Sequence, residues 1–323
     1  MALDAGGYHA QASAAYAWLA AAQRPDGSWA SSYREGRVVD ATGEAHHAAY
    51  VAVGVWHHAL ATGDDQFLVS MWATVRRGLD WVVGLQGPQG QVWWAASPTG
   101  DVDELALTTG SASVHHGLLA GLAIAARLGQ PVPHWRAAAI AVRHALVDHT
   151  DVFADRSRYS MDWYYPMLGC AVTGPAGWAR LIDRWDEFIV PGLGIRCVTD
   201  RPWVTGAETC ELALAVEASG RRGLAAELVC SMQHLRHDDG AYWTGLVVAD
   251  GVRWPVERTT WTSAAMVLAV DALADTGPHS AVFRPESFAH LLGGDLLPVD
   301  HVTEPWDCPS CAADVANRTP AAR

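Results

Sequence analysis

Acidic residues recur in this chain where helices are expected to begin, and they are the residues best suited to chemistry. Carboxylates packed together cannot all ionise, so one of them is held protonated and can act as an acid. A single acid at a helix start is also explained as a cap or as a partner of the helix dipole. The candidate catalytic residues are Asp101, Asp103, Glu104, Asp162, Glu208 and Glu257, with His46 as a candidate general base.

Aromatic side chains lie close to these acids in the sequence. Trp163 and Tyr164, for example, directly follow Asp162. A pocket that combines acids with aromatic rings suits a neutral or cationic substrate. It fits two chemistries, namely a carbocation stabilised by aromatic faces or a sugar processed between carboxylates and stacking rings. The predicted substrate-binding aromatic residues are Trp93, Trp163, Tyr164, Trp203, Trp254 and Trp261.

The elements that position these residues are predicted to be helices. Apolar residues recur every three or four positions, and Gly, Pro and Asp turns separate the periodic segments. The expected helices cover residues 8–23, 44–61, 66–85, 101–128, 134–148, 161–169, 178–189, 221–235, 257–274 and 285–292, with a further helix capped at 205. No convincing strand competes with them, although a short β piece is expected between 245 and 252.

The helices are expected to form pairs. Two helices in each unit of about fifty residues, repeated five or six times, are typical of stacked helical hairpins. One helix of a pair carries Arg and Asp, as an outer helix would, whereas the other is small and apolar, as an inner helix would be. The sequence therefore predicts an all-α fold, an α/α toroid or (α/α)5-6 barrel with a central cavity. We expect one domain over residues 1–295 and a tail over 296–323 that includes a small Cys/His segment.

A pattern of Gln, Gly and Trp recurs in the turns between hairpins. Residues 23–29 read Gln-Arg-Pro-Asp-Gly-Ser-Trp, and looser copies occur at 86–93 and 233–243. The pattern resembles the QW repeat of the squalene-cyclase and prenyltransferase superfamily, in which the Gln and Trp lock one hairpin to the next. The resemblance covers residues 8–273 and implies an α/α toroid that handles an isoprenoid.

This resemblance also implies roles for individual residues. Asp103 would protonate the substrate as in class II terpene cyclases, with Asp101 and Glu104 as its neighbours. Arg201 would correspond to a diphosphate-binding cation of the protein prenyltransferases. The zinc site of those enzymes also needs a His on the next inner helix, and no His stands there, so a zinc prenyltransferase is not expected.

Histidine and cysteine offer further candidate ligands. Histidine pairs occur at 46–47, 57–58 and 115–116, and because adjacent helical residues point about 100° apart, we expect at most one of each pair in a given site. Near the C-terminus, Cys308, Cys311 and His301 are candidates for a structural zinc ion, although a second Cys pair is absent. No other cofactor is implied.

The composition limits the partners. A formal net charge of -13 argues against nucleic acid and anionic membrane surfaces, since both require a basic footprint. The sequence shows no transmembrane segment and no signal peptide, so we expect a cytoplasmic protein.

We therefore expect an enzyme of the terpenoid cyclase or prenyltransferase type, acting on an isoprenoid in an acidic and aromatic cavity by class II-type protonation. One alternative is a carbohydrate-active (α/α)6 hydrolase or epimerase that acts on a sugar with Asp162, Glu208 or Glu257 and His46. Another is a catalytically silent toroid that binds a lipid or a protein partner.

Overall fold

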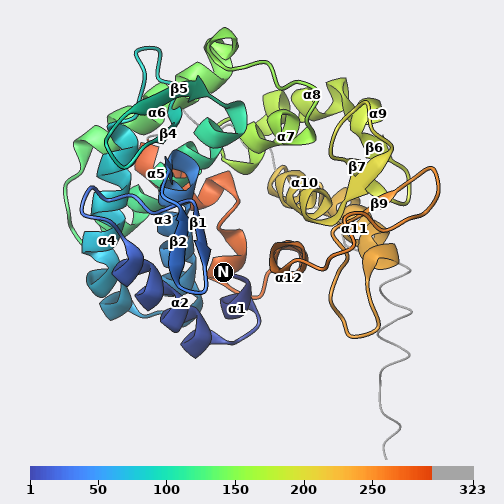
Figure 1. Ribbon diagram of the computed structural model, residues 1–323, viewed down its shortest axis with the longest axis horizontal. Helices are drawn as coiled ribbons and strands as arrows, with labels where there is room; N and C mark the ends of the chain where they lie inside the picture. Colours follow the sequence, from blue (N-terminus) through green and yellow to red (C-terminus); the bar gives the residue numbers. More distant parts are fainter. Residues whose placement is uncertain (293–323) are drawn as a thin grey trace, which may run out of the picture.

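The computed structural model describes residues 1–292 of the chain and shows two layers of helices arranged in a ring (Figure 1). The inner layer consists of α3 (Ala45–Thr62), α5 (Thr108–Arg127), α7 (Ser160–Leu168), α10 (Gly206–Ala218) and α12 (Thr260–Ala274). The outer layer consists of α2 (His9–Ala22), α4 (Asp65–Val83), α6 (Pro133–Asp148), α8 (Gly174–Asp183) and α11 (Arg222–Ser231). Consecutive inner helices pack against one another, and each outer helix packs on an inner one. The predicted α/α toroid is confirmed.

The hydrophobic pattern of each helix explains its layer. Helix α5 is built mainly from Ala, Gly, Ser and Leu, and it is buried throughout residues 110–125. Helix α4 buries a single stripe that includes Leu68, Met71, Val75 and Leu79. A helix that is apolar all round must be surrounded by protein, whereas an amphipathic helix covers the outside.

Three small antiparallel sheets lie on the face of the ring that is turned towards the viewer in Figure 1. The first contains β1 (Ser32–Arg34) and β2 (Arg37–Asp40), and the second contains β3 (Gly43–Glu44), β4 (Trp93–Ala96) and β5 (Val102–Ala106). The third contains β6 (Ile189–Val190), β7 (Gly194–Arg196), β8 (Trp203–Thr205) and β9 (Gly245–Val247). The short elements are α1 (Ala2–Ala5), η1 (Thr150–Val152), α9 (Trp185–Phe188), η2 (Met232–Leu235), η3 (Pro278–Ala281), η4 (Pro285–Phe288) and α13 (Ala289–Leu292).

Residues 102–106 form strand β5, and the prediction that an inner helix begins at residue 101 is wrong. The hydroxyls of Ser97 and Thr99 donate hydrogen bonds to the Asp101 carboxylate at 3.1 and 2.6 Å, which builds a hairpin turn. Strand β5 then pairs with β4, placing Asp103 opposite Ala95. Asp101 therefore organises a turn between strands, and α5 begins only at residue 108.

The repeated turn joins neighbouring hairpins in its first two copies. Gln23 Nε2 donates to the carbonyl oxygen of Thr74 in α4 at 2.9 Å. Gln86 Nε2 donates in the same way to the carbonyl oxygen of Ala138 in α6 at 3.1 Å. Each glutamine thus links its own turn to the outer helix of the next hairpin.

The ring closes where the start of the chain meets its later part. Helix α1 packs against both α12 and α3, and η3 also contacts both helices. The fully buried carboxylate of Asp4 accepts hydrogen bonds from Nδ1 of His58 at 2.8 Å and Nδ1 of His9 at 3.1 Å. Burial alone would raise the pKa of Asp4, but hydrogen bonds from the surrounding histidines lower it to about 2.

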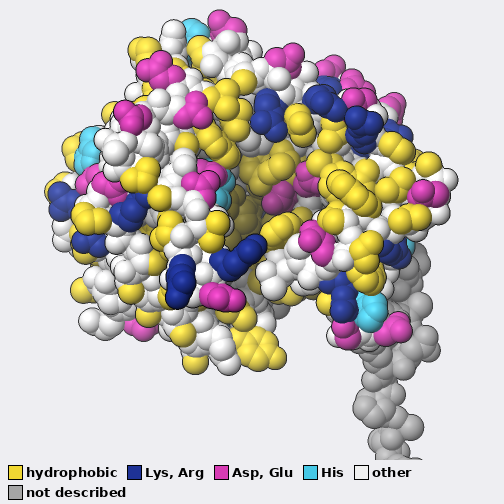
Figure 2. All heavy atoms as spheres, in the orientation of Figure 1, with side chains coloured by type: hydrophobic (Ala, Val, Ile, Leu, Met, Phe, Trp, Pro, Cys, Tyr) yellow, Lys and Arg dark blue, Asp and Glu magenta, His cyan; other side chains and the backbone are white. Residues whose placement is uncertain are grey.

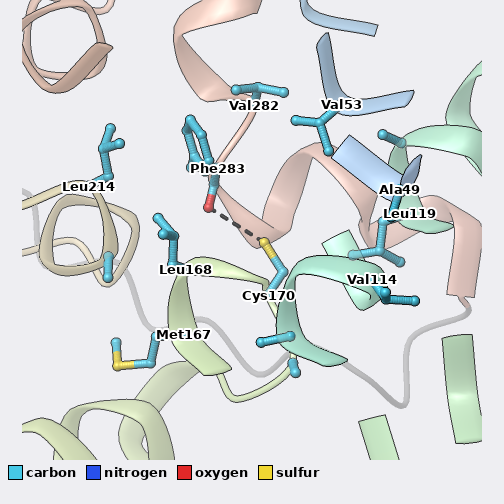
Figure 3. Close-up of a cluster of buried hydrophobic side chains, with 14 of the residues drawn as sticks. Ala49, Val53, Val114, Leu119, Met167, Leu168, Cys170, Leu214, Val282 and Phe283 are labelled. Atoms are coloured by element: carbon cyan, nitrogen blue, oxygen red, sulfur yellow. Dashed lines mark hydrogen bonds between the residues drawn. The ribbon is translucent and has the colours of Figure 1, made fainter. Parts of the chain in front are cut away.

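Part of the ring interior is filled by the segment after η3. Figure 3 shows Val282 and Phe283 among side chains of four inner-helix segments, which include Ala49, Val53, Leu119, Leu168 and Leu214. The Cys170 thiol, just after the C-terminal end of α7, donates to the Phe283 carbonyl oxygen at 3.5 Å. This apolar plug therefore packs against α3, α5, α7 and α10 and fills part of the ring interior.

Substitution of Gly90 by Ala should destabilise the fold strongly, because a Cβ there would lie 2.1 Å from the Ala141 carbonyl oxygen of α6. Gly240 in the third copy is the matched control, since its φ of +91° is close to the +93° of Gly90 and its Cβ would meet nothing within 4 Å. Gly240→Ala should cost only the backbone strain of about 1–2 kcal/mol. Gly90→Ala should lower the free energy of unfolding by about 2 kcal/mol more, as an overpacked contact does. Urea unfolding measures both losses of unfolding free energy. Equal losses in the two variants would contradict the close contact between Gly90 and α6.

Substitution of Asp4 by Asn should weaken ring closure at neutral pH. A carboxyl whose pKa falls from 3.8 to about 2 on folding stabilises the protein above pH 4 by about 2 kcal/mol, and this stabilisation disappears as the pH falls towards 2. The difference in unfolding free energy between wild type and Asp4→Asn should therefore shrink between pH 4 and pH 2. Urea unfolding across this range tests it, and a difference independent of pH would contradict the assigned role.

Candidate active site

Figure 2 shows a hollow at the centre of the face that carries the sheets, with hydrophobic side chains on its floor and acidic side chains at its wall. Helix α10 carries two carboxylates near its start, with Glu208 in the first turn and Glu211 one turn later. Residues three apart share one face of a helix. The other residues of α10 are mostly buried and apolar, apart from a third acid, Glu217, near the C-terminal end, which pairs with Arg222 and Arg284.

Glu211 lies where three inner helices meet. The hydroxyls of Tyr164 and Tyr165 in α7 donate to its carboxylate at 2.5 and 3.2 Å. Burial, together with the charge of Glu211, raises the pKa of Tyr50, which comes from α3 on the other side of α5. Burial also raises the pKa of Glu211 itself, although the two tyrosine hydrogen bonds oppose this change.

Glu208 is the residue best placed to hold a proton near neutral pH. Burial raises its pKa to about 7, and the charge of Glu211 acts in the same direction. A hydrogen bond with Cys197 opposes the increase without cancelling it. A carboxyl group with a pKa near the working pH is suited to general acid catalysis.

Asp162 is a buried carboxylate in the first turn of α7, and Glu208 and Glu211 are not among the residues that line its cavity. Burial raises its pKa to about 6, although the charges of Arg156 and Arg180 and a hydrogen bond from the Thr109 backbone lower it. Its side chain lines a cavity of about 860 Å³, which is also bordered by Thr108, Asp151, Asp155, Arg156, Arg180 and Arg184.

Glu44, at the end of β3, faces two histidines of the first turn of α3. Its Oε2 lies 3.6 Å from Nδ1 of His46 and 3.7 Å from Nδ1 of His47. The prediction that at most one histidine of this pair can enter a given site is wrong, because Glu44 precedes the helix and reaches back to both rings. Burial lowers the pKa of His46 to about 3, so its imidazole is neutral. The ring of Trp94 stacks on it at 4.4 Å between centroids.

The other predicted site residues differ in their exposure to solvent. Asp101, Asp103 and Glu104 are exposed on the hairpin of β4 and β5, and Glu257 and Arg201 are exposed on loops. Trp163 is buried against Phe188 at 5.0 Å between ring centroids. Trp254, before α12, is 54% exposed, and Trp261, in the first turn of α12, is 62% exposed, while Trp93 and Trp203 are half-buried. Cys308, Cys311 and His301 lie outside the described residues.

Glu211, Tyr50 and Tyr165 were missed by the sequence prediction, which looked for acids only at helix starts. One signal could have revealed Glu211. A second acid three positions after Glu208, inside a helix that is otherwise small and apolar, must be buried or face a cavity.

The fold is an α/α toroid that several solved structures share. The match to the structure of a D-mannose isomerase covers 77% of this chain and 77% of the isomerase chain, at 10% identity and with a TM-score of 0.58. The match to the endo-β-1,4-glucanase CMCax of Acetobacter xylinum covers 82% of this chain and 98% of the glucanase chain, at 11% identity and with a TM-score of 0.51. The match to an uncharacterised conserved protein of Thermus thermophilus covers 83% of this chain and 90% of that protein, at 12% identity and with a TM-score of 0.61.

The sequence comparison is more specific than the fold. The chain is 50% identical over 295 residues to the MMP endo-(1,4)-3-O-methyl-α-D-mannosidase of Mycolicibacterium hassiacum, covering 91% of this chain and 82% of the relative. This chain belongs to the family of that mannosidase. No family model matches the sequence.

This relationship corrects the resemblance drawn from the turns. The chain is not a member of the terpenoid cyclase and prenyltransferase superfamily, and the isoprenoid substrate and the class II proton donor are wrong, because a half-identical relative is a mannosidase. The turn with Gln, Gly and Trp joins neighbouring hairpins, but its presence does not identify a member of that superfamily. Within residues 1–292, no helix has the length and apolar character needed to cross a lipid bilayer.

Substitution of Glu208 by Gln should make the protein more stable at alkaline pH. Because the pKa of Glu208 rises from 4.5 to about 7 on folding, the wild type should lose stability as the pH rises from 4.5 to 7, by roughly 1–3 kcal/mol. Glu208→Gln should lack that loss, as urea unfolding at pH 5 and pH 8 would show. Glu257→Gln, at an exposed position, controls for removing one negative charge. The same pH dependence in wild type and Glu208→Gln would contradict the assigned pKa.

Proposed function

We propose that this chain is an endo-acting glycoside hydrolase that cleaves internal (1,4) bonds between 3-O-methyl-α-D-mannose units. The observation that carries the proposal is the 50% identity to the mannosidase over nearly the whole chain. The carboxylates at the hollow support it, since most glycosidases use a pair of Asp or Glu residues that flank the bond to be broken.

Glu208 is assigned as the general acid. With a pKa of about 7 it carries a proton in a large fraction of molecules at neutral pH. It would donate that proton to the glycosidic oxygen as the bond to the anomeric carbon breaks. The leaving sugar then departs as an alcohol, so no charge accumulates on it.

Asp162 is assigned as the second carboxylate. Its pKa of about 6 leaves it mostly ionised at pH 7, in contrast to Glu208. It lies in the first turn of α7, next to α10 in the inner ring, so both acids belong to the same face of the toroid. One mostly ionised and one largely protonated carboxylate match the division of roles in glycoside hydrolysis, where the base takes a proton from the attacking water.

The exposed aromatic residues suit a methylated sugar. Trp254 and Trp261 present large apolar surfaces, and Val256 between them is 78% exposed. Methyl ethers replace hydroxyl groups by apolar groups, so a 3-O-methylated chain buries more apolar surface on such residues than an unmethylated chain.

Substitution of Glu208 by Gln should lower kcat by about 10²- to 10⁴-fold, the usual contribution of a positioned general acid. The substrate would be an oligosaccharide of (1,4)-linked 3-O-methyl-α-D-mannose, and mass spectrometry of the products would show fragments from internal cleavage. The wild-type rate should fall as the pH rises above 7, because Glu208 loses its proton.

Asp103→Asn is the matched control, since it removes an acid that is exposed on β5, and it should keep the wild-type rate. Three results would contradict the proposal: no cleavage of this substrate by the wild type, release of terminal sugars alone, or full activity in Glu208→Gln. Isomerisation of free D-mannose without any hydrolysis would assign the hollow to a different reaction.

A further inference from the structure

Glu44, His46 and His47 form a cluster of metal-ligand side chains at the start of α3. The carboxylate Oε2 lies 3.6 Å from one imidazole Nδ1 and 3.7 Å from the other, and the three residues' ligand atoms all lie within 4.8 Å of one another. Within residues 1–292 this is the one group of three or more such residues with ligand atoms so close together.

The separations fit an ion better than hydrogen bonds. A donor and acceptor 3.6 Å apart are too distant for a hydrogen bond. Two ligand atoms that each bind a tetrahedral ion at about 2.1 Å are about 3.4 Å from each other. The Glu44 oxygen is therefore within a few tenths of an ångström of the separation that a shared ion would impose on each imidazole nitrogen.

An unpaired nitrogen is the second observation. Nδ1 of His46 is buried and has no hydrogen-bond partner. A buried polar atom without a partner is uncommon in native proteins, and an unseen ion or water is one of its ordinary explanations. This nitrogen is also the atom that faces Glu44 at 3.6 Å.

The surrounding sheet holds the ligands in place. Trp94 of β4 stacks on the His46 ring with an interplanar angle of 20°. The next residue of β4, Ala95, pairs with Glu44 in β3. One short sheet thus fixes both the carboxylate and an imidazole before any ion binds, which is the preorganisation that a metal site needs.

We propose that Glu44, His46 and His47 bind a divalent transition-metal ion of the zinc or cobalt type. Two imidazole nitrogens and one carboxylate oxygen suit these borderline ions better than magnesium or calcium, which prefer oxygen ligands. Three protein ligands leave a fourth position for water or a substrate oxygen. The site is independent of the proposed hydrolysis, since ion binding needs no substrate.

The test is calorimetric titration of metal-free protein with Zn²⁺ and with Co²⁺, in a Cys308→Ser, Cys311→Ser background without an affinity tag. One ion should bind each chain. Loss of a partner outside the ligand shell already lowers metal affinity by about 10- to 100-fold, so Glu44→Gln and His47→Ala should each weaken binding at least tenfold. The cobalt absorption bands should change in the same variants.

His134→Ala is the matched control, since it removes an exposed histidine that pairs with Asp80 on the outer surface. It should bind as tightly as the parent protein. Far-ultraviolet circular dichroism of each variant verifies that the fold is retained. The proposal is overturned if the parent protein binds no ion, or if Glu44→Gln and His47→Ala bind as it does. Because no substrate is present, these results are separate from any failure of the mannosidase assay.

Discussion

The ring encloses a hollow only because its two ends are held together, and the buried carboxylate of Asp4 is central to that contact. Helix α1 sits between α12 and α3, and Asp4 connects it to His58 of α3. Breaking one side of a buried, hydrogen-bonded charge leaves the other group unpaired, which is more costly than losing a surface ion pair. Helix α3 also carries Tyr50, whose pKa is raised by burial and by the charge of Glu211 in α10. The geometry of the hollow thus depends on a contact made outside it.

Apolar side chains fill part of the ring interior, whereas acidic side chains lie at the starts of two inner helices. The plug around Val282 and Phe283 fills one part with apolar side chains, while the N-terminal ends of α7 and α10 carry Asp162 and Glu208. Burial disfavours the charged form of a carboxyl group, so these pKa values rise. The charges of Arg156 and Arg180 oppose the rise at Asp162, whereas the charge of Glu211 adds to the rise at Glu208. Near neutral pH, Asp162 with a pKa of about 6 is therefore more fully ionised than Glu208 with a pKa of about 7, which suits the roles of base and acid.

The sequence predicted the helices and the toroid well, because their signal is local and repeated. It failed at residues 101–106, where pairing with β4 overrides a plausible helix start, and pairing of that kind is not encoded in the segment itself. The acid at 208 was predicted from its place at a helix start, and the structure adds the two tyrosine partners of Glu211, which come from a different helix. The approach of both histidines to Glu44 was excluded by an argument about helical spacing that does not apply to a residue just before the helix.

The turn pattern predicted the architecture correctly and the family wrongly, for a physical reason. In any ring of hairpins, each turn must approach the next outer helix closely, so it needs a small residue and a side chain that can satisfy a free carbonyl group. Gly90 and Gln86 meet these two needs, and neither touches the hollow. A pattern that arises from stacking hairpins can recur in toroids with unrelated chemistry, because function belongs to the site and not to the fold. The residues that distinguish a sugar hydrolase from a carbocation cyclase are those on the cavity wall. Here that wall combines acids with different neighbours and hydrogen-bonding tyrosines, an arrangement that suits a polar substrate more than a hydrocarbon chain.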